Sequence, residues 1–222
     1  MPRIRRGIFP HCPFHILNRG NARQKIFHND SDYQDFIHLI AKAKKRHPLQ
    51  ILAFCLMPNH FHMCVSTAHG PNISQFMQWL LTAHVRRVHS LKKTSGHIWQ
   101  GRFKSFSIQS DTHLLTVLRY IEANPVRARL VTFARQWPWS SFVFRQNPRG
   151  LGIVDHSPVP LPENWEDYVN SSLSMRELEA IRLSIGRQSP LGELHWVEEI
   201  VRRFGLWSTI NPRGRPRKIS KK

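Results

Sequence analysis

The sequence is poor in cysteine, in acidic residues and in long apolar runs. Its three cysteines, Cys12, Cys55 and Cys64, form no C-x-x-C pair. We therefore expect neither a disulfide framework nor a cysteine-rich zinc site, and the pattern fits a reducing cytoplasm. No apolar run approaches the roughly 18 residues of a membrane span, and none follows the charged start of the chain. We accordingly expect no membrane helix and no signal peptide.

The shortage of acidic residues leaves a strongly basic chain. Only 14 acidic residues stand against 33 lysines and arginines, so the formal net charge is +19 over 222 residues. Such a chain attracts polyanions, which makes nucleic acid the first candidate partner and an anionic membrane surface the second. Apolar residues make up 41% of the sequence, including 13 Phe and 7 Trp. This content is enough for a packed core and excludes a fully disordered chain.

The distribution of charge predicts the domain organisation. Residues 155–199 hold nine of the 14 acidic residues, whereas residues 200–222 hold none. Proline and asparagine cluster between these parts and the basic body, as is typical of a boundary. We predict a globular domain at 1–146, a linker at 147–165, a helical region at 166–206 and a basic tail at 207–222.

Apolar periodicity and turn signals predict an α+β domain. Strands are expected at 14–18, 50–57, 60–65 and 102–108, and helices at 30–46, 72–91 and 111–124. This order is the split β-α-β pattern of ferredoxin-like (RRM-like) folds, with one extra helix. We expect an antiparallel sheet with helices on one face and the other face open to a ligand.

Helix caps and the C-terminal helices complete the predicted architecture. Asp30 or Ser31 is expected to cap the first helix, and Asp111 or Thr112 the third. Two further helices, at 174–185 and 191–204, are predicted to form a C-terminal helical tail. The first of them opens with a capping box from Ser174 to Glu177.

His60-Phe61-His62 is the first candidate site. Side chains alternate along a strand, so His60 and His62 share one face while Phe61 points to the core. Two imidazoles about 7 Å apart can share a divalent metal if a third ligand is present. With 14 histidines in the chain, roughly one H-x-H pair is expected by chance. The pattern alone is therefore weak evidence for a metal site.

Tyr120 is the second candidate. On the helix at 111–124 it lies at the edge of the apolar face, and Asn124 lies four residues further on the same edge. One interpretation is a half-buried packing residue with its hydroxyl in water. The other is a nucleophile that faces a metal, with Asn124 as the third ligand. Neither Tyr33 nor Tyr168 has an Asn or Gln four residues later.

Four short motifs follow one another along the chain. They are LMPNHFHMCV (56–65), WQGRFKS (99–105), YIEANPVRARLV (120–131) and WPWSSF (137–142). Together they resemble the REP-associated tyrosine transposases, which belong to the bacterial HUH single-tyrosine transposases. The C-terminal segments RQSPLGELHWVEEIVRRFGL (187–206) and PRGRPRK (212–218) also resemble that family. The resemblance covers nearly the whole chain and identifies residues 1–146 as the catalytic domain.

The resemblance implies a specific chemistry. His60 and His62 would bind Mg²⁺ or Mn²⁺, Asn124 would complete the metal site, and Tyr120 would attack a DNA phosphate to form a 5′-phosphotyrosine link. Related transposases use Gln where this chain has the shorter Asn124. The implied substrate is single-stranded DNA that folds as a palindromic hairpin. The implied setting is a monomer in the bacterial cytoplasm, associated with the nucleoid.

Basic and aromatic residues near the site are candidate DNA contacts, because single strands bind through phosphate pairing and base stacking. Trp99 has core packing as its alternative. The Arg-Gly-Arg of the tail has the form of an AT-hook for the minor groove, with a nonspecific basic tail as its alternative. The candidates are Arg19, Arg86, Arg87, Trp99, Gln100, Arg102, Lys104, Arg213 and Arg215.

Two other functions remain open at this point. The first is a catalytically silent protein that binds hairpin DNA or RNA on the same sheet. The second is a zinc-dependent hydrolase that uses His60, His62 and Cys64, which follows them on the same strand face. A Tyr120→Phe substitution separates these hypotheses, because only the transposase needs the tyrosine hydroxyl.

Overall fold

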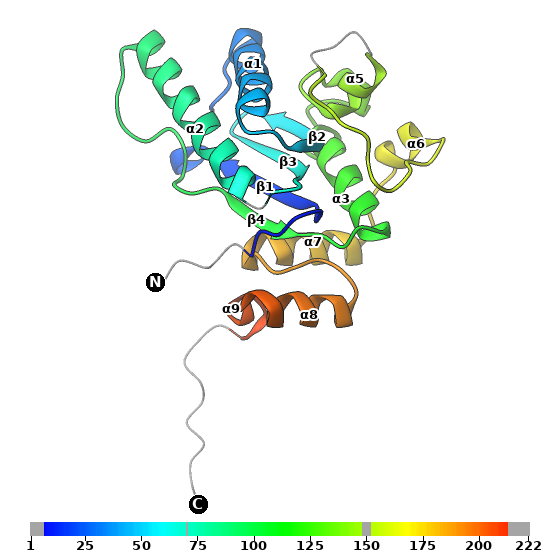
Figure 1. Ribbon diagram of the computed structural model, residues 1–222. Helices are drawn as coiled ribbons and strands as arrows, with labels where there is room; N and C mark the ends of the chain where they lie inside the picture. Colours follow the sequence, from blue (N-terminus) through cyan, green and yellow to red (C-terminus); the bar gives the residue numbers. More distant parts are fainter. Residues whose placement is uncertain (1–6, 70, 148–151, 213–222) are drawn as a thin grey trace, which may run out of the picture.

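The strands pair into one four-stranded sheet in which neighbours are antiparallel, in the order β2-β3-β1-β4. The computed structural model describes residues 7–69, 71–147 and 152–212. This strand order, with a helix between β1 and β2 and another between β3 and β4, is that of a ferredoxin-like domain. It confirms the predicted α+β class. The strands are β1 (Phe14–Arg19), β2 (Gln50–Met57), β3 (His60–Ser66) and β4 (Lys104–Ser107) (Figure 1).

The turn between β2 and β3 consists of Pro58 and Asn59 and sets the register of the hairpin, in which Met57 pairs with His60. Backbone groups from the loop after β1 hold this turn. The Pro58 carbonyl accepts from Ile26 N at 2.7 Å, and the Asn59 carbonyl accepts from Gly20 N at 2.8 Å. The predicted hairpin is therefore anchored to a distant part of the chain.

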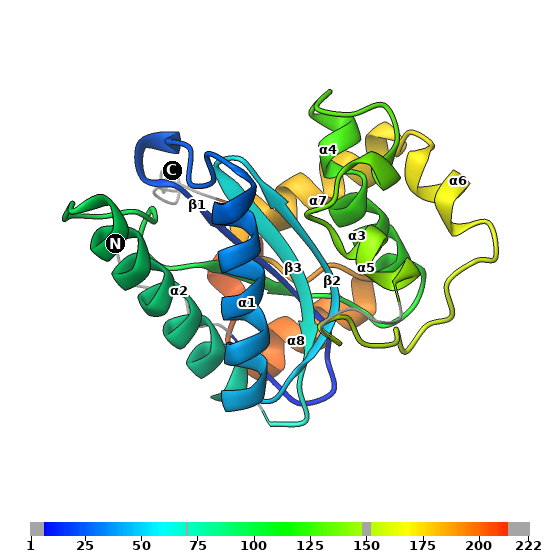
Figure 2. The ribbon, with the colours of Figure 1, turned by 90° about the horizontal axis from the view of Figure 1, so that it is seen from above.

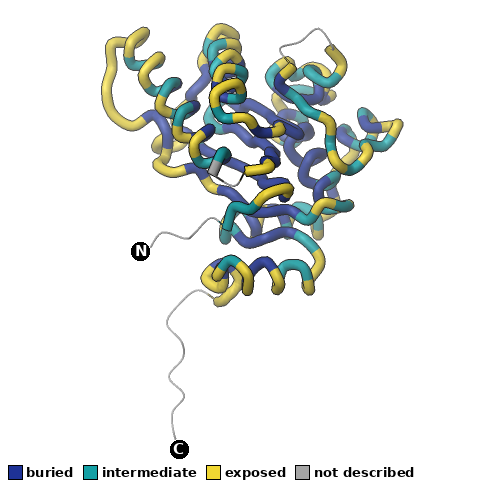
Figure 3. The backbone as a smooth tube through the Cα atoms, viewed as in Figure 1, coloured by how far each residue is buried: buried dark blue, intermediate teal, exposed yellow. Residues whose placement is uncertain are grey.

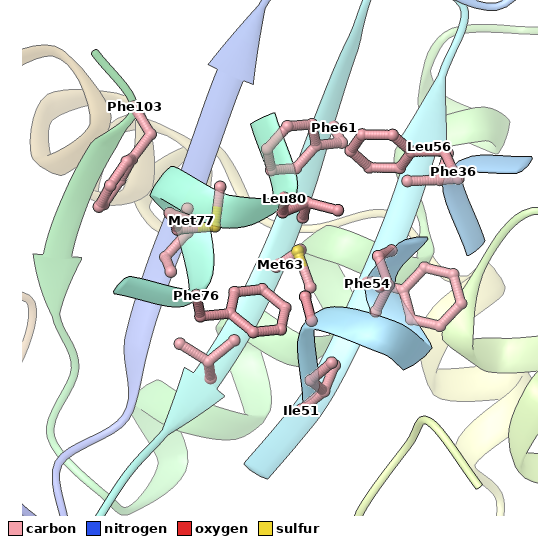
Figure 4. Close-up of a cluster of buried hydrophobic side chains, with 14 of the residues drawn as sticks. Phe36, Ile51, Phe54, Leu56, Phe61, Met63, Phe76, Met77, Leu80 and Phe103 are labelled. Atoms are coloured by element: carbon pink, nitrogen blue, oxygen red, sulfur yellow. The ribbon is translucent and has the colours of Figure 1, made fainter. Parts of the chain in front are cut away.

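Two helices, α1 (Asp30–Arg46) and α2 (Pro71–Lys92), cover one face of the sheet (Figure 2). Their apolar stripes meet the alternate strand side chains in a dense core (Figure 4). The cap of α1 is Asn29, whose side chain accepts from Asp32 N at 3.0 Å, and not Asp30 or Ser31 as predicted. The core includes Phe36, Ile40, Phe54, Leu56, Phe61, Met63, Phe76, Met77 and Leu80.

A third helix, α3 (Thr112–Glu122), covers the opposite face and begins after its predicted cap, Asp111. Its apolar stripe forms a second core with inward side chains of β2, β3 and β4. The expectation that helices lie on one face only is therefore wrong, because both faces of the sheet carry apolar side chains that need cover. The helix breaks at Ala123, and the one-turn helix α4 (Asn124–Arg127) follows with Pro125 in its first turn.

Other segments of the chain form hydrogen bonds with the two outer strands. Along β2, Leu56 N donates to Trp139 O, and Trp137 Nε1 donates to Leu56 O, each at 2.9 Å. Beside β4, Leu191 N donates to Ser107 O, also at 2.9 Å. The WPWSSF motif thus supports an edge strand, and the C-terminal region is joined directly to the sheet.

The C-terminal helices pack against the body. Helix α7 begins with the predicted capping box of Ser174 and Glu177. Figure 1 shows α7 below the sheet, with α8 and α9 beyond it. The remaining helices are η1 (Asn21–Arg23), η2 (Ala134–Gln136), α5 (Ser141–Gln146), α6 (Trp165–Asn170), α7 (Met175–Arg187), α8 (Leu194–Phe204) and α9 (Trp207–Ile210).

Burial is concentrated in the sheet and on the helix faces turned toward it (Figure 3). Within the segment predicted as a linker, Ile153 is buried, and Asp155 pairs with Lys44 at 2.6 Å. The division into domains stays a prediction. In the part of the chain that the structure describes, no helix is long and apolar enough to span a membrane.

His84 of α2 is a buried histidine within the aromatic core. Its ring lies between Phe36, at a centroid distance of 5.0 Å, and Trp99, at 5.3 Å. Its Nδ1 has no hydrogen-bond partner among the described residues. Burial lowers the pKa of His84 to about 4, because the charged ring would lose its hydration.

We predict that His84 makes the fold less stable in mild acid. Below its ordinary pKa of 6.5 the unfolded chain binds a proton that the folded chain does not, so the free energy of unfolding falls as the pH falls from 6.5 toward 4. The slope from one such group is at most about 1.4 kcal/mol per pH unit. Urea denaturation between pH 7 and 5 should show a shallower loss for His84→Leu than for the parent chain. Equal slopes in the two proteins would contradict the assignment.

Candidate active site

The sheet face under α3 carries three histidines in neighbouring rows. Residues directly opposite in antiparallel strands share a face. His60 pairs with Arg19, and His62 pairs with Leu17, so both histidines lie on this face as predicted. His15 of β1, which the sequence analysis did not single out, pairs with Cys64 on the same face. Strand alternation places His15 there, but nothing local marks it as part of a site.

Each histidine of the pair is held through its Nδ1 atom. His60 Nδ1 lies 2.6 Å from Asn59 Oδ1, and an amide oxygen only accepts, so His60 Nδ1 carries the proton. Asn59 Nδ2 donates to Arg23 O at 3.2 Å, which orients that amide. His62 Nδ1 lies 2.9 Å from His15 Nε2. The two rings, 5.0 Å apart between centroids, thus keep Nε2 as the nitrogen for a further ligand.

Burial keeps these imidazoles neutral at pH 7. It lowers the pKa of His60 to about 4, with smaller contributions from the cations Arg19 and Arg127. The pKa of His62 is held well below its ordinary value, first by burial and then by the neighbouring histidines and arginines. Burial also lowers the pKa of His15 to about 3. Neutral imidazole is the form that binds a metal ion.

Tyr120 lies opposite the histidines on α3. Its ring centroid is 5.6 Å from that of His62, and its side chain is buried. The guanidinium of Arg127 lies over the Tyr120 ring, 4.2 Å from its centroid. The ring is thus more deeply buried than the half-buried packing residue of the first interpretation, and the same residue lines a cavity together with the histidine pair.

Asn124 lies one helical turn after Tyr120, at the start of α4. Its Nδ2 donates to Tyr120 O at 2.9 Å, and its Oδ1 accepts from Arg127 Nη1 at 3.4 Å. The side chain is buried and lines the cavity. Although the helix breaks at Ala123, the side chains of Tyr120 and Asn124 still face the same cavity, as their spacing of four residues predicted.

The cavity has a volume of about 410 Å³ and brings all four predicted site residues together. No acidic side chain lines it, whereas three arginines do. Arg127 and Arg182 are residues that the sequence analysis missed. Arg127 follows Tyr120 by two helical turns, which is a detectable signal, but no local signal places Arg182 here. The wall consists of Leu17, Arg19, Met57, His60, His62, Tyr120, Asn124, Arg127, Ala128, Arg182, Ile185 and Gly186.

The predicted DNA contacts near the site are divided by the fold. Arg19 lines the cavity, and its buried Nε has no hydrogen-bond partner among the described residues. Lys104 pairs with Leu17 and lies exposed on the same sheet face. Gln100 and Arg102 are exposed in the preceding loop. Trp99 is a core residue, 5% exposed and packed on Phe61, which agrees with its core-packing alternative.

Two of the remaining predicted contacts lie away from the cavity. Arg86 and Arg87 are exposed on α2, on the other side of the sheet, and Arg87 Nε donates to Asp35 at 2.7 Å. Arg213 and Arg215 lie outside the described residues.

The ligand set of the zinc hydrolase hypothesis is not assembled. Cys64 is fully buried, and burial raises the pKa of its thiol well above the ordinary value. Within residues 7–69, 71–147 and 152–212, no three His, Cys, Asp or Glu side chains are placed to hold a metal ion together. The structure therefore does not support a site built from His60, His62 and Cys64.

A buried carboxylate holds the helix that carries Tyr120. Glu122 accepts from Ser141 Oγ, from Arg145 Nε at 3.0 Å and from Trp165 Nε1 at 2.8 Å. These partners come from α5 and α6, so one side chain ties α3 to both. Its charge is tolerated in the interior because it is paired and hydrogen-bonded.

Comparison with known proteins assigns the chain to a family and agrees with the fold. Residues 9–124, more than half of the chain, match the family described as Transposase IS200 like. The chain belongs to this family of transposases, enzymes that cut DNA.

Its relatives in sequence are more specifically named. A REP-associated tyrosine transposase of Escherichia coli K12 is 29% identical over 148 residues, which is 64% of this chain and 82% of that protein. A Haemophilus influenzae protein, provisionally given the same name, is 29% identical over 122 residues, 49% of this chain and 69% of its own. A solved structure of a REP-associated tyrosine transposase bound to a REP hairpin shares the fold, with a TM-score of 0.54 and 24% identity, covering 73% of this chain and 96% of that one.

We predict that the Glu122 network contributes strongly to stability. Glu122→Ala leaves Arg145 and Trp165 Nε1 without their buried partner, which should lower the free energy of unfolding by about 3–5 kcal/mol. The matched control is Glu166→Ala, which removes a surface ion pair with Arg135 at 2.8 Å and should cost at most about 1 kcal/mol. Urea denaturation measures both. Equal losses for the two variants would show that the buried network adds nothing.

Proposed function

We propose that this chain cuts and rejoins single-stranded DNA at palindromic hairpin repeats, with Tyr120 as the nucleophile. The observation that carries the proposal is that one cavity contains Tyr120, His60 and His62, with arginines and no acidic side chains in its wall. Membership of the IS200-like transposases supports the DNA substrate. The hairpin substrate is taken from the REP-associated tyrosine transposase whose solved structure is bound to a REP hairpin, and the REP association from the relatives in sequence.

Each step of the proposed reaction forms one bond between phosphorus and oxygen and breaks another. The Tyr120 oxygen attacks phosphorus, its proton is lost, and the bond between phosphorus and the 3′-oxygen breaks. This gives a 5′-phosphotyrosine link and a strand with a free 3′-hydroxyl, whose oxygen has gained a proton. The 3′-hydroxyl of another end then attacks the same phosphorus and releases the tyrosine. No nucleotide cofactor is needed, because the phosphotyrosine ester retains the energy of the broken bond.

The residues around Tyr120 fit this role. The Arg127 guanidinium over the ring places positive charge against the face of the phenolate that attacks phosphorus. Arg19 has a buried Nε with no partner among the described residues and lines the same cavity, so it is available to a phosphate. The Tyr120 ring and the Asn124 side chain are both buried, which limits the motion of the nucleophile.

His60, His62 and Asn124 would hold Mg²⁺ or Mn²⁺ in the proposed enzyme. Both imidazoles are neutral and keep Nε2 for a ligand, and the Asn124 amide supplies an oxygen. Two nitrogens and one oxygen suit Mn²⁺ better than the harder Mg²⁺. Such an ion would withdraw charge from a nonbridging phosphate oxygen.

We also propose that the enzyme acts as a monomer. The histidines come from β3 and the tyrosine from α3 of the same chain, and they meet in one cavity. A second copy is not needed to bring the nucleophile to the metal ligands.

The competing function is a catalytically silent hairpin-binding protein. It would need the basic cavity but not the tyrosine hydroxyl or the free Nε2 atoms. An arrangement in which Asn59 and His15 hold both imidazoles through Nδ1 favours the enzyme, because binding alone does not require that order.

A denaturing-gel assay tests the proposal. Labelled hairpin DNA with a single-stranded flank, taken from repeats beside the gene, is mixed with protein and Mn²⁺ or Mg²⁺. We expect a covalent adduct with the parent chain and none with Tyr120→Phe. The matched control is Tyr168→Phe on α6. It keeps the ring under the Arg119 guanidinium and should form the adduct as the parent does. Tight hairpin binding without an adduct from the parent would favour the silent protein.

We predict that His15 orients His62 toward the metal. His15→Phe removes the partner of His62 Nδ1 and should weaken Mn²⁺ binding about 10- to 100-fold, the usual cost of losing such a partner. Titration followed by electron paramagnetic resonance measures Mn²⁺ affinity without any cleavage. His97→Ala, which removes an exposed histidine, serves as the control. Unchanged affinity in His15→Phe would show that the contact is structural only.

A further inference from the structure

Helix α7 forms one wall of the cavity that contains Tyr120, through Arg182, Ile185 and Gly186. The other walls come from β1, β2, β3, α3 and α4 and the residue after it. The C-terminal helical region is therefore part of the site and not only an appendage to the catalytic domain. Figure 1 shows α7 running below the sheet and close to it.

Both ends of α7 are fixed to the body. Before its first turn, Arg119 Nη2 of α3 donates to Ser171 O at 3.0 Å and to Ser172 O at 2.8 Å. After its last turn, Leu191 N donates to Ser107 O of β4 at 2.9 Å. Ile181, in the middle of the helix, is fully buried. The wall is thus held in place at three points.

The cavity collects positive charge from three separate elements. Arg19 comes from β1, Arg127 from α4 and Arg182 from α7. Arg182 is exposed, and no ion pair joins any of these three arginines to an acidic side chain in the described part of the chain. Three guanidinium groups around one cavity repel each other, and a bound polyanion removes that cost.

A DNA strand matches this arrangement because it carries a phosphate at every nucleotide. Arg127 lies over the Tyr120 ring, 4.2 Å from its centroid, and so belongs to the part of the cavity where Tyr120 would attack. Arg182 lies on a different wall, formed by α7, where a neighbouring phosphate of the same strand could reach it. We propose that Arg182 of α7 binds a backbone phosphate next to the one that Tyr120 attacks. This inference rests on the proposed function and assigns a substrate contact to the C-terminal helical region.

The experiment measures binding and not cleavage. Each variant is made in a Tyr120→Phe chain, and the affinity for the hairpin oligonucleotide is followed by fluorescence anisotropy at several salt concentrations. We expect Arg182→Ala to weaken binding about tenfold and to reduce the salt slope by about one phosphate contact. Arg182→Lys keeps the charge and should recover part of the loss.

The matched control is Arg176→Ala. Arg176 is an exposed arginine of the same helix and does not line the cavity. Its loss should change affinity less than twofold. Thermal unfolding of both variants should match the parent, because both side chains are exposed. Equal weakening by Arg182→Ala and Arg176→Ala would overturn the proposal, since it would indicate a general effect of charge.

A neutral methylphosphonate placed at one backbone position at a time locates the contact. At the position next to the cleavage site, the neutral linkage should weaken the parent but leave Arg182→Ala unchanged. The linkage and the substitution are coupled where the linkage weakens the parent but not Arg182→Ala. Coupling only at positions in the hairpin stem, or at no position, would overturn the proposal. If coupling is found but the wild-type chain forms no adduct, the phosphate contact stands and the proposed chemistry fails. Absence of hairpin binding by the Tyr120→Phe chain would overturn both.

Discussion

The register of β3 between β2 and β1 is the constraint on which the rest of the site depends. Strand side chains alternate, so a slip of one residue would send His60 and His62 into the α1–α2 core and Phe61 to the cavity. The turn at Pro58 and Asn59 prevents that slip, because backbone donors from the loop after β1 hold both carbonyls. Asn59 also orients His60. One turn therefore sets both the strand pairing and the direction of the His60 ring.

The opposite half of the site depends on how α3 is held. Apolar side chains dock the helix on the sheet, but such contacts are non-directional. Glu122 adds direction, because its carboxylate accepts from three partners on α5 and α6. Tyr120, two residues earlier, then faces His62 with the Arg127 guanidinium over its ring. A buried charge close to the proposed nucleophile thus orients the helix that carries it.

Electrostatics gives the cavity a consistent character. Burial and nearby cations hold the pKa values of His60 and His62 below neutral pH, so these imidazoles are ready to bind a metal. The arginines of the wall have no acidic neighbours in the lining of the cavity. A site of this kind disfavours further cations other than a coordinated metal and favours a phosphate backbone. Family membership and local physics therefore indicate the same class of substrate.

The sequence itself determined which side chains share a face of a strand or a helix, because strand and helix side chains repeat with fixed periods. Strand alternation put His60 and His62 on one face, and helical spacing put Tyr120 beside Asn124; the structure brings all four together. Contacts between distant segments were not readable. Trp99 packs in the aromatic core, and α3 covers the second face of the sheet. His15 contacts His62, and Arg182 lines the cavity. Periodicity reports which side of an element a residue occupies, whereas packing decides which element that side meets.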